Sequence, residues 1–350
     1  MPEPNKNAPF AALLAAAAFG LSTPLAKLLL GDMSPWALAS LLYLGSGIGL
    51  GLITLLRPKP GTTEARLRRT DVPWLLGTIF FGGIAGPILL LLGLSTTDAA
   101  SASLLLNLEA VFTLLLAWVV FKEHVDKRLF MGAVAIVAGA VLLSWQGRFG
   151  EASFGVGLIA LACLSWGIDN NLTRQISAVD PFVLASIKGL VAGCVNGVLA
   201  HAMGSTMPDI LPLAGAMMLG FVSYGLGLVL FIVALRHLGT ARTGAYYGTA
   251  PFIGALAATV ILGDTLTPTL VVAGGLMAFG AWLHLSERHG HEHAHETLNH
   301  DHRHVHDEHH QHEHEPDDPR VEPHSHAHQH GPLKHTHAHW PDIHHRHRHV

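Results

Sequence analysis

The sequence has little charge and almost no cysteine for its length. Only 13% of its 350 residues are Asp, Glu, Lys or Arg, and its two cysteines are Cys163 and Cys194. Two thiols exclude a disulfide framework or a four-cysteine zinc site, and a net charge of −4 excludes a basic nucleic-acid binder. Hydrophobic residues make up 50% of the chain and glycine contributes 37 residues, so an ordinary soluble globule is excluded as well.

The few charges and the histidines are concentrated at one end. From Glu287 onward the chain holds 23 of its 27 histidines, together with 12 acidic and 6 basic side chains. The part of the chain before Glu287 is therefore far more apolar than the average over the whole sequence indicates. We interpret it as an integral membrane unit followed by a histidine-rich tail.

Long apolar runs predict ten membrane-spanning helices. A bilayer core needs about 20 apolar residues in helical form, and no run shows the polar face of a soluble helix. The predicted spans are 9–30, 35–56, 73–94, 99–121, 129–145, 154–173, 181–203, 210–235, 243–262 and 268–285.

The charges between the spans predict the orientation. If the N-terminus is cytoplasmic, twelve basic residues lie in the cytoplasmic segments and only Arg148 lies outside. Cytoplasmic loops carry such an excess of Lys and Arg. An even number of spans then returns the tail to the cytoplasm, and the expected location is the inner membrane.

Two halves of the apolar part repeat each other. One constant shift along the chain places Ala110 on Pro251 and Gly139 on Gly280, and a slightly longer shift places Phe19-Gly20 on Trp166-Gly167. Each half has five spans, so the second must be inverted relative to the first. We therefore expect repeats at 1–150 and 151–286, followed by the tail at 287–350. Inverted repeats are typical of transporters with a central, alternately accessible site.

These motifs resemble the EamA family of the drug/metabolite transporter superfamily. The resemblance rests on Phe19-Gly20 and Trp166-Gly167, and on two stretches, from Leu108 to Glu123 and from Gly248 to Asp264. The family commonly has Glu-Pro within these stretches. Here the first repeat keeps Glu109 without the proline, and the second keeps Pro251 without the glutamate. The resemblance implies an all-α membrane fold of two five-helix repeats and a transport function.

Ionisable groups at membrane depth are costly and therefore mark candidate sites. Glu109 falls near the middle of its span, as a proton- or cation-coupling carboxylate or as a structural carboxyl. Asp169 and Lys188 should reach similar depth on an antiparallel hairpin, with Asn170 beside them. They form either a structural ion pair or a split pair that binds both ends of a zwitterion.

Other polar residues receive weaker assignments. Tyr224, Tyr246 and Tyr247 are candidates for lining the solute path, and Tyr246 is the one assigned to the site, although packing explains one or two of these tyrosines equally well. Asn107 and Asn196 are expected to form interhelical hydrogen bonds. Lys27, near the outer end of its span, is expected to extend its ammonium group to the membrane interface.

The tail contains too few apolar residues to fold alone, and we expect it to be disordered. Neutral imidazoles in a His-x-His pattern suit zinc, nickel and cobalt. A solvated tail that tolerates histidine is the alternative. The candidate metal ligands are His291, His293, His295, His302, His304, His306, His326, His328, His344 and His345.

The favoured function is secondary transport of a small organic solute, with a metal-binding or pH-responsive tail. The alternatives are a divalent-metal transporter and a non-transporting membrane metal buffer or sensor. An enzyme is not expected, because no nucleophile–base pair is evident. The expected partners are the bilayer, a small-molecule substrate and transition-metal ions. A homodimer is the candidate assembly. No cofactor is required and no nucleic acid is expected.

Overall fold

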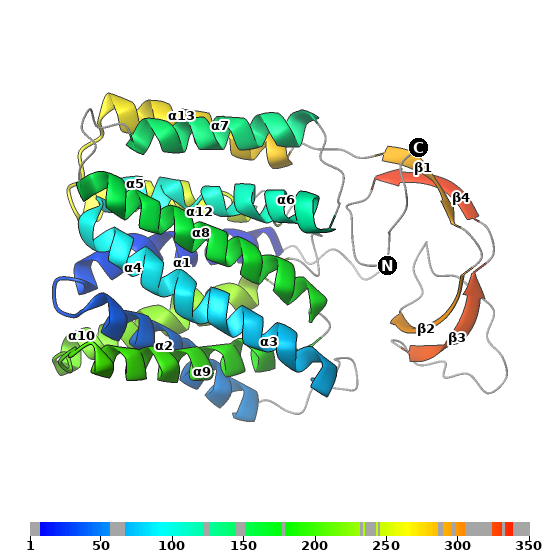
Figure 1. Cartoon of the computed structure of the whole chain (residues 1–350), viewed down its shortest axis with the longest axis horizontal. Coiled ribbons are helices and arrows are strands. Elements are labelled where there is room, and N and C mark those ends of the chain that lie inside the picture. Colours follow the sequence, from blue (N-terminus) through cyan, green and yellow to red (C-terminus); the bar gives the residue numbers. More distant parts are fainter. Residues whose placement is uncertain are drawn as a thin grey trace. The chain divides into compact units, whose positions relative to one another are not determined.

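The computed structural model divides the chain into two compact units, a helical unit that ends at Glu287 and a second unit that contains the tail from Arg288. The residues that it describes are 8–56, 67–121, 127–144, 151–176, 179–231, 234, 243, 246–285, 290–295, 298–304, 324–330 and 333–338. Each unit is described by itself (Figure 1).

Helices occupy nearly all of the described part of the first unit (Figure 1). In the first half they are α1 (Ala8–Leu29), α2 (Pro35–Leu56), η1 (Arg69–Asp71), α3 (Val72–Thr78), η2 (Ile79–Ala85), α4 (Gly86–Thr96), α5 (Ala99–Leu105), α6 (Leu108–Phe121) and α7 (Lys127–Ser144). In the second half they are α8 (Glu151–Gln175), α9 (Pro181–Ala202), α10 (Ile210–Leu219), η3 (Gly220–Leu226), α12 (Ala250–Ile261) and α13 (Pro268–Leu285).

The sequence marks where several of these helices begin. The backbone N–H of Phe182 donates to the Asp180 carboxylate at 2.8 Å, and Pro181 occupies the first turn of α9. Likewise, Ser34 accepts from the N–H of Ala37 at 3.2 Å where α2 starts with Pro35. Proline suits the first turn because its missing N–H has no helical partner there. The second span of each repeat therefore begins in the same way.

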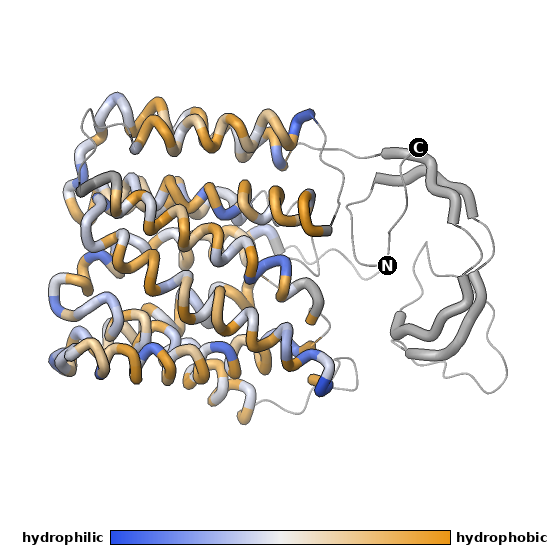
Figure 2. Tube along the Cα trace, viewed as in Figure 1, coloured by the Kyte–Doolittle hydropathy of each residue, from blue (hydrophilic) through white to orange (hydrophobic). Residues whose placement is uncertain are grey.

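Among the described residues, eight helical segments are long and apolar enough to cross a membrane. Hydropathy colouring shows these helices as predominantly apolar, with hydrophilic residues confined to short stretches (Figure 2). The protein is therefore a multi-pass membrane protein. The two other predicted spans correspond to α8 and to α12, which is shorter. The count of ten spans stays a prediction.

The two halves repeat element by element. The shift that places Gly139 on Gly280 also carries α7 onto α13 and η2 onto η3 with identical bounds. Both η2 and η3 are π-helical turns, which are rare and often mark functional positions in a helix. Each one interrupts the α-helical pattern of a span at the same place in its repeat.

Equivalent helices of the two halves pack against each other (Figure 1). Gly197, late in α9, lies against Ser40 early in α2, whereas Gly51 late in α2 lies against Ser186 early in α9. The pair α2 and α9 is therefore antiparallel. The same holds for α7 and α13, where Gly132 lies beside His284 and Gly139 beside Ala273. Small residues at these contacts let the backbones approach closely.

The tail unit contains four strands, β1 (Gly290–His295), β2 (Leu298–His304), β3 (His324–His330) and β4 (Leu333–Ala338). They form two separate antiparallel pairs, β1 with β4 and β2 with β3. The expectation of a tail without regular structure is not confirmed at these residues. In both pairs the register sets histidines opposite histidines, as in His293 with His335 and His302 with His326.

Candidate functional site

Glu109 lies just after a break in its span. The helix is interrupted at Leu106 and Asn107, and α6 starts again at Leu108. The Asn107 amide donates to the Leu104 carbonyl at 2.8 Å, so its hydrogen bond is local and the prediction of an interhelical bond is wrong. Glu109 therefore occupies the first turn of α6, where the helix dipole stabilises a negative charge.

Asn170 joins Glu109 to α8. Its side-chain amide donates to Glu109 Oε1 at 2.8 Å and to Thr113 Oγ1 at 3.3 Å. The neighbouring Asn171 donates to the Gly167 carbonyl at 2.8 Å and to the Thr113 carbonyl at 3.3 Å. The two asparagines thus fasten α8 to the first turns of α6. Glu109 is half-buried and Asn170 is exposed.

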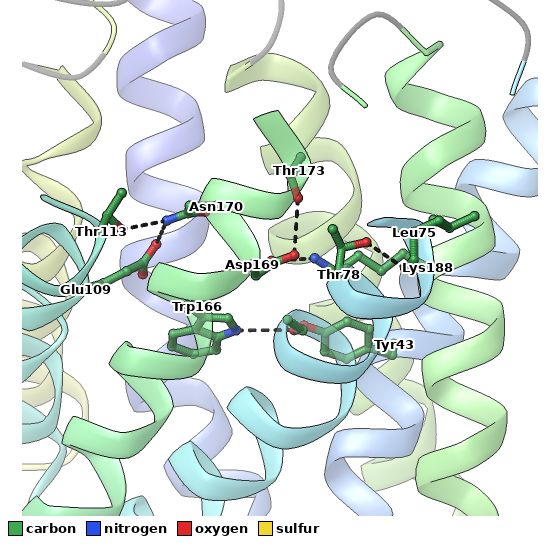
Figure 3. Close-up of polar contacts among 11 residues, drawn as sticks. Tyr43, Leu75, Thr78, Glu109, Thr113, Trp166, Asp169, Asn170, Thr173 and Lys188 are labelled. Carbon is green, nitrogen blue, oxygen red and sulfur yellow. Dashed lines mark hydrogen bonds and ion pairs between the residues drawn. The ribbon is translucent and has the colours of Figure 1, made fainter. Parts of the chain in front are cut away.

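Asp169 and Lys188 form the ion pair that the hairpin geometry predicts. Lys188 Nζ lies 2.5 Å from Asp169 Oδ2, and the Thr173 hydroxyl donates to Asp169 Oδ1 at 3.2 Å. The side chain of Lys188 is 19% exposed and that of Asp169 is 11% exposed. Because Asp169 and Asn170 are consecutive on α8, they face different neighbours. This helix therefore links the Glu109 carboxylate to the Lys188 ammonium group of α9 (Figure 3).

The ion pair lies directly on the π-helical turn η2. A methyl group added at Gly82 would collide with the Asp169 carboxylate and the Lys188 ammonium group. The carbonyl of the same glycine accepts two hydrogen bonds, from the Tyr43 hydroxyl at 2.5 Å and from Trp166 Nε1 at 3.2 Å (Figure 3). Four elements, α2, η2, α8 and α9, therefore meet at Gly82.

Asn196 supports the next residue of η2. Its amide donates to the Gly83 carbonyl at 3.0 Å, and its side chain is fully buried. The predicted interhelical hydrogen bond of Asn196 is therefore present, between α9 and η2. Its other amide atom, Oδ1, is buried without a hydrogen-bond partner in the described residues.

An aromatic row extends from Tyr43 to Phe231. Ring centroids are 5.7 Å apart for Tyr43 and Tyr224, 6.1 Å for Tyr224 and Phe19, 5.7 Å for Phe19 and Tyr247, and 4.6 Å for Tyr247 and Phe231. The row joins α1, α2 and η3 to the segment before α12. Tyr224 and Tyr247 take part in these ring contacts, and the assignment of Tyr246 to the solute path stays a prediction.

Two charged side chains, Lys27 and Asp264, bind backbone groups at the ends of other helices. Lys27 Nζ donates to the carbonyls of Leu94 at 2.5 Å, Ser95 at 3.3 Å and Thr97 at 2.9 Å, where the last carbonyls of α4 lack helical partners. The ammonium group of Lys27 therefore lies at the end of a span, and its position at the membrane interface stays a prediction. Asp264 accepts from the N–H of Ala100 at 2.9 Å, where α5 begins.

The candidate metal ligands of the tail lie on strands or outside the described residues. His291, His293 and His295 belong to β1, His302 and His304 to β2, and His326 and His328 to β3. His306, His344 and His345 lie outside the described residues. No group of three metal-ligating side chains occurs among the described side chains of the chain. Metal binding by the tail stays a prediction.

Comparison with known proteins finds relatives that are transporters. The sequence pattern of the EamA-like transporter family matches residues 6–145 and matches again over 153–286. An uncharacterized transporter of Methanothermobacter thermautotrophicus is 31% identical over 281 residues, covering 76% of this chain and 82% of that protein. Relatives of this kind are named as transporters, pumps and exporters rather than as enzymes.

Two relatives have names that mention amino acids. A probable amino-acid metabolite efflux pump of Salmonella typhimurium is 26% identical, covering 79% of this chain and 94% of that protein. A probable terminal-alkyne amino-acid exporter of Streptantibioticus cattleyicolor is 25% identical, covering 62% of this chain and 74% of that protein. A crystal structure with 20% identity has the same fold, with a TM-score of 0.59 over 79% of this chain and 95% of the matched chain.

Proposed function

Because the chain belongs to the EamA-like transporter family, we propose that it is a secondary transporter that moves a small organic solute across the membrane by alternating access. The observation that carries this proposal is the polar network around α8. Glu109 of α6 binds Asn170 and Lys188 of α9 binds Asp169, so that one turn of α8 connects the charged side chains of three helices. Charged groups inside a membrane protein are costly and mark solute or ion pathways.

Alternating access needs two half-molecules that exchange roles. Equivalent helices pack antiparallel in the pairs α2–α9 and α7–α13, which is the relation that inverted repeats require. The broken span near Glu109 has a repeat counterpart, since α12 starts anew at Ala250 after turns at Gly248 and Thr249. Discontinuous helices of this kind flank solute sites in transporters. The proposal therefore places both repeats around one site.

An amino-acid-like solute fits best among small organic solutes. Two relatives are named as a probable efflux pump and a probable exporter of amino-acid compounds. Glu109 is the proposed coupling group, because it is half-buried and its carboxylate accepts a hydrogen bond from the neutral amide of Asn170. A carboxylate in this setting binds and releases one proton without breaking an ion pair.

The proposed location is the inner membrane, with both termini in the cytoplasm, because basic residues dominate one set of loops. The tail is proposed as a cytoplasmic metal-binding or pH-responsive modulator. Its paired strands favour this role, since histidines lie opposite histidines in both ladders and imidazole suits zinc, nickel and cobalt. The homodimer stays a prediction.

Metal transport is the second candidate, favoured by the same histidine ladders. A divalent cation crossing the bundle would meet Glu109 and Asp169, but also the ammonium group of Lys188, which repels it. The organic solute therefore remains the better candidate.

Transport by the purified protein in proteoliposomes tests both candidates. We expect counterflow of at least one radiolabelled amino acid and no movement of zinc, nickel or cobalt. Movement of a metal ion without counterflow of any organic solute would replace the first candidate by the second. A protein that moves neither class contradicts the transport proposal itself.

A further inference from the structure

We propose that Asp169 and Lys188 are a split ion-pair site that binds the ammonium and carboxylate groups of a zwitterionic solute of the α-amino-acid type. The assignment rests on the proposed transport function and names the residues that recognise the solute. In the structure the two side chains bind each other. The solute opens the pair, with its ammonium group on Asp169 and its carboxylate on Lys188.

The repeat supplies an internal control for this assignment. With Phe19 aligned to Trp166, Asp169 corresponds to Ser22. Counting from the prolines that begin α2 and α9, Lys188 corresponds to Leu42. Ser22 is 2% exposed and Leu42 is 1% exposed. The equivalent place in the other half of the molecule is thus folded and buried without any charge.

The π-helical turn under the ion pair also has an uncharged counterpart in the other repeat. Gly82 of η2 corresponds to Ser223 of η3, whose hydroxyl donates to the Ala18 carbonyl at 2.6 Å. Leu42 lies against η3, since a methyl group at Gly220 would meet the Leu42 backbone. Each π-helical turn therefore packs against the second span of the opposite repeat, η3 against α2 and η2 against α9. Only one of these two places holds an ion pair, so the fold itself does not require it.

The balance of charge selects a zwitterion. Removing one partner of a buried ion pair leaves an uncompensated charge, which is strongly unfavourable. A solute with a single charge would leave such a group behind when it opens the pair. A zwitterion replaces one ion pair by two and brings no net charge into the bundle. An amine without a carboxylate, or an acid without an amine, does not have this property.

The backbone beneath the pair is held in place. The absence of a side chain at Gly82 lets the carboxylate and the ammonium group pack directly on the backbone of η2. The Gly82 carbonyl is held by Tyr43 and Trp166, which keeps this surface in place while the pair opens. The Thr173 hydroxyl remains bonded to Asp169 and orients its carboxylate.

Thermal unfolding of the full-length protein in detergent tests the assignment, with the twenty common L-amino acids as probes. We expect at least one of them to raise Tm. Its methyl ester, which keeps only the ammonium group, and its N-acetyl form, which keeps only the carboxylate, should act at least about tenfold more weakly. A tenfold difference corresponds to about 1.4 kcal/mol.

Three variants locate the effect. Asp169→Asn and Lys188→Met should each abolish the rise in Tm caused by the amino acid. The double variant with both changes carries no charge at the pair and should fold even if the single variants do not, while failing to respond. Asp32→Asn, in the exposed turn after α1, is the matched control and should respond as the wild type does.

Three results would overturn the assignment. They are the absence of any response to the twenty probes, an equal response to the blocked analogues, and an unchanged response of the double variant. Failure of the assignment is separable from failure of transport. If the double variant moves a neutral solute at the wild-type rate in proteoliposomes, the protein is a transporter and the ion pair is structural.

Discussion

Gly20 and Gly167 hold equivalent positions in the two repeats, and each lies against the second half of a broken span from the opposite repeat. A methyl group at Gly20 would collide with Ala250 at the start of α12, and one at Gly167 would meet Phe112 and Thr113 in α6. The aromatic residue before each glycine packs toward a π-helical turn, since Phe19 contacts Tyr224 and Trp166 binds Gly82. The aromatic-glycine motif thus joins both repeats around the candidate site.

The first prediction concerns the proposed coupling carboxylate. Glu109→Gln keeps the size of the side chain and its hydrogen bond to Asn170 but removes the exchangeable proton. We expect a protein that inserts into the membrane normally and has lost proton-dependent transport. Counterflow and pH-driven uptake in proteoliposomes measure this, with Asn107→Ala as a control next to the same helix break. A wild-type rate with wild-type pH dependence would show that Glu109 is structural.

The second prediction concerns the energetics of Asp169 and Lys188. Each single alanine substitution leaves an unpaired charge in a low-dielectric environment, at a cost of roughly 3–5 kcal/mol. Removing both should cost less than either change alone. A double-mutant cycle on the free energy of unfolding in detergent measures the coupling. Additive losses would mean that the 2.5 Å contact contributes nothing to stability.

The third prediction uses two glycines as a matched pair. At Gly82 an added methyl group collides with the ion pair, whereas at Gly157 in α8 it meets nothing within 4 Å. Gly82→Ala should therefore destabilise the protein by about 1–3 kcal/mol, as overpacking does, and should weaken solute binding. Gly157→Ala should leave both unchanged or slightly raise stability. Equal behaviour of the two variants in thermal unfolding would contradict the packing around Gly82.

The fourth prediction follows from the shared acceptor at Gly82. Tyr43→Phe or Trp166→Phe alone leaves its carbonyl with one donor, so each change should cost little. Both changes together leave a buried carbonyl without these partners, at about 1–3 kcal/mol. The combined loss of stability should therefore exceed the sum of the single losses. The ring-preserving change Tyr247→Phe is the control, and strict additivity would contradict the shared bond.

Much of this architecture could be predicted from the sequence, because it depends on local and periodic signals. The shift that places Gly139 on Gly280 locates the equivalent spans, and the short connection between α8 and α9 predicts the contact of Asp169 with Lys188. The π-helical turn η2 could not be predicted. It depends on donors from other spans, Tyr43, Trp166 and Asn196, whose sequence neighbourhoods are ordinary apolar helices.

The sequence also does not identify partners that lie far along the chain. It predicts that Lys27 lies near the outer end of its span, but not that its ammonium group binds the carbonyls at the end of α4.

The fifth prediction concerns metal binding by the tail and has two tests, of which the first removes the tail. Residues 287–350 hold 23 histidines, and their 12 acidic and 6 basic side chains give a formal charge of −6 with these histidines neutral. Metal binding or acidification therefore changes the charge of the tail strongly. A variant that ends after Arg288 should insert, unfold at the wild-type temperature and still transport an organic solute. It should lose zinc and nickel binding, together with any effect of these ions on the transport rate.

A second tail variant tests whether the strand register matters for metal binding. His326 lies opposite His302 in the β2–β3 ladder, and the next residue is Ala327. Exchanging the two, as His326→Ala with Ala327→His, keeps the composition but moves one imidazole to the opposite face, because successive strand residues alternate. The same exchange at His293 and Ala294 disturbs the β1–β4 ladder, where His293 lies opposite His335. If the ladders bind metal, both exchanges should weaken zinc binding in a competition titration of the full-length protein. If density of histidine alone is sufficient, neither exchange should change the affinity, and the strands would then have no part in the metal response.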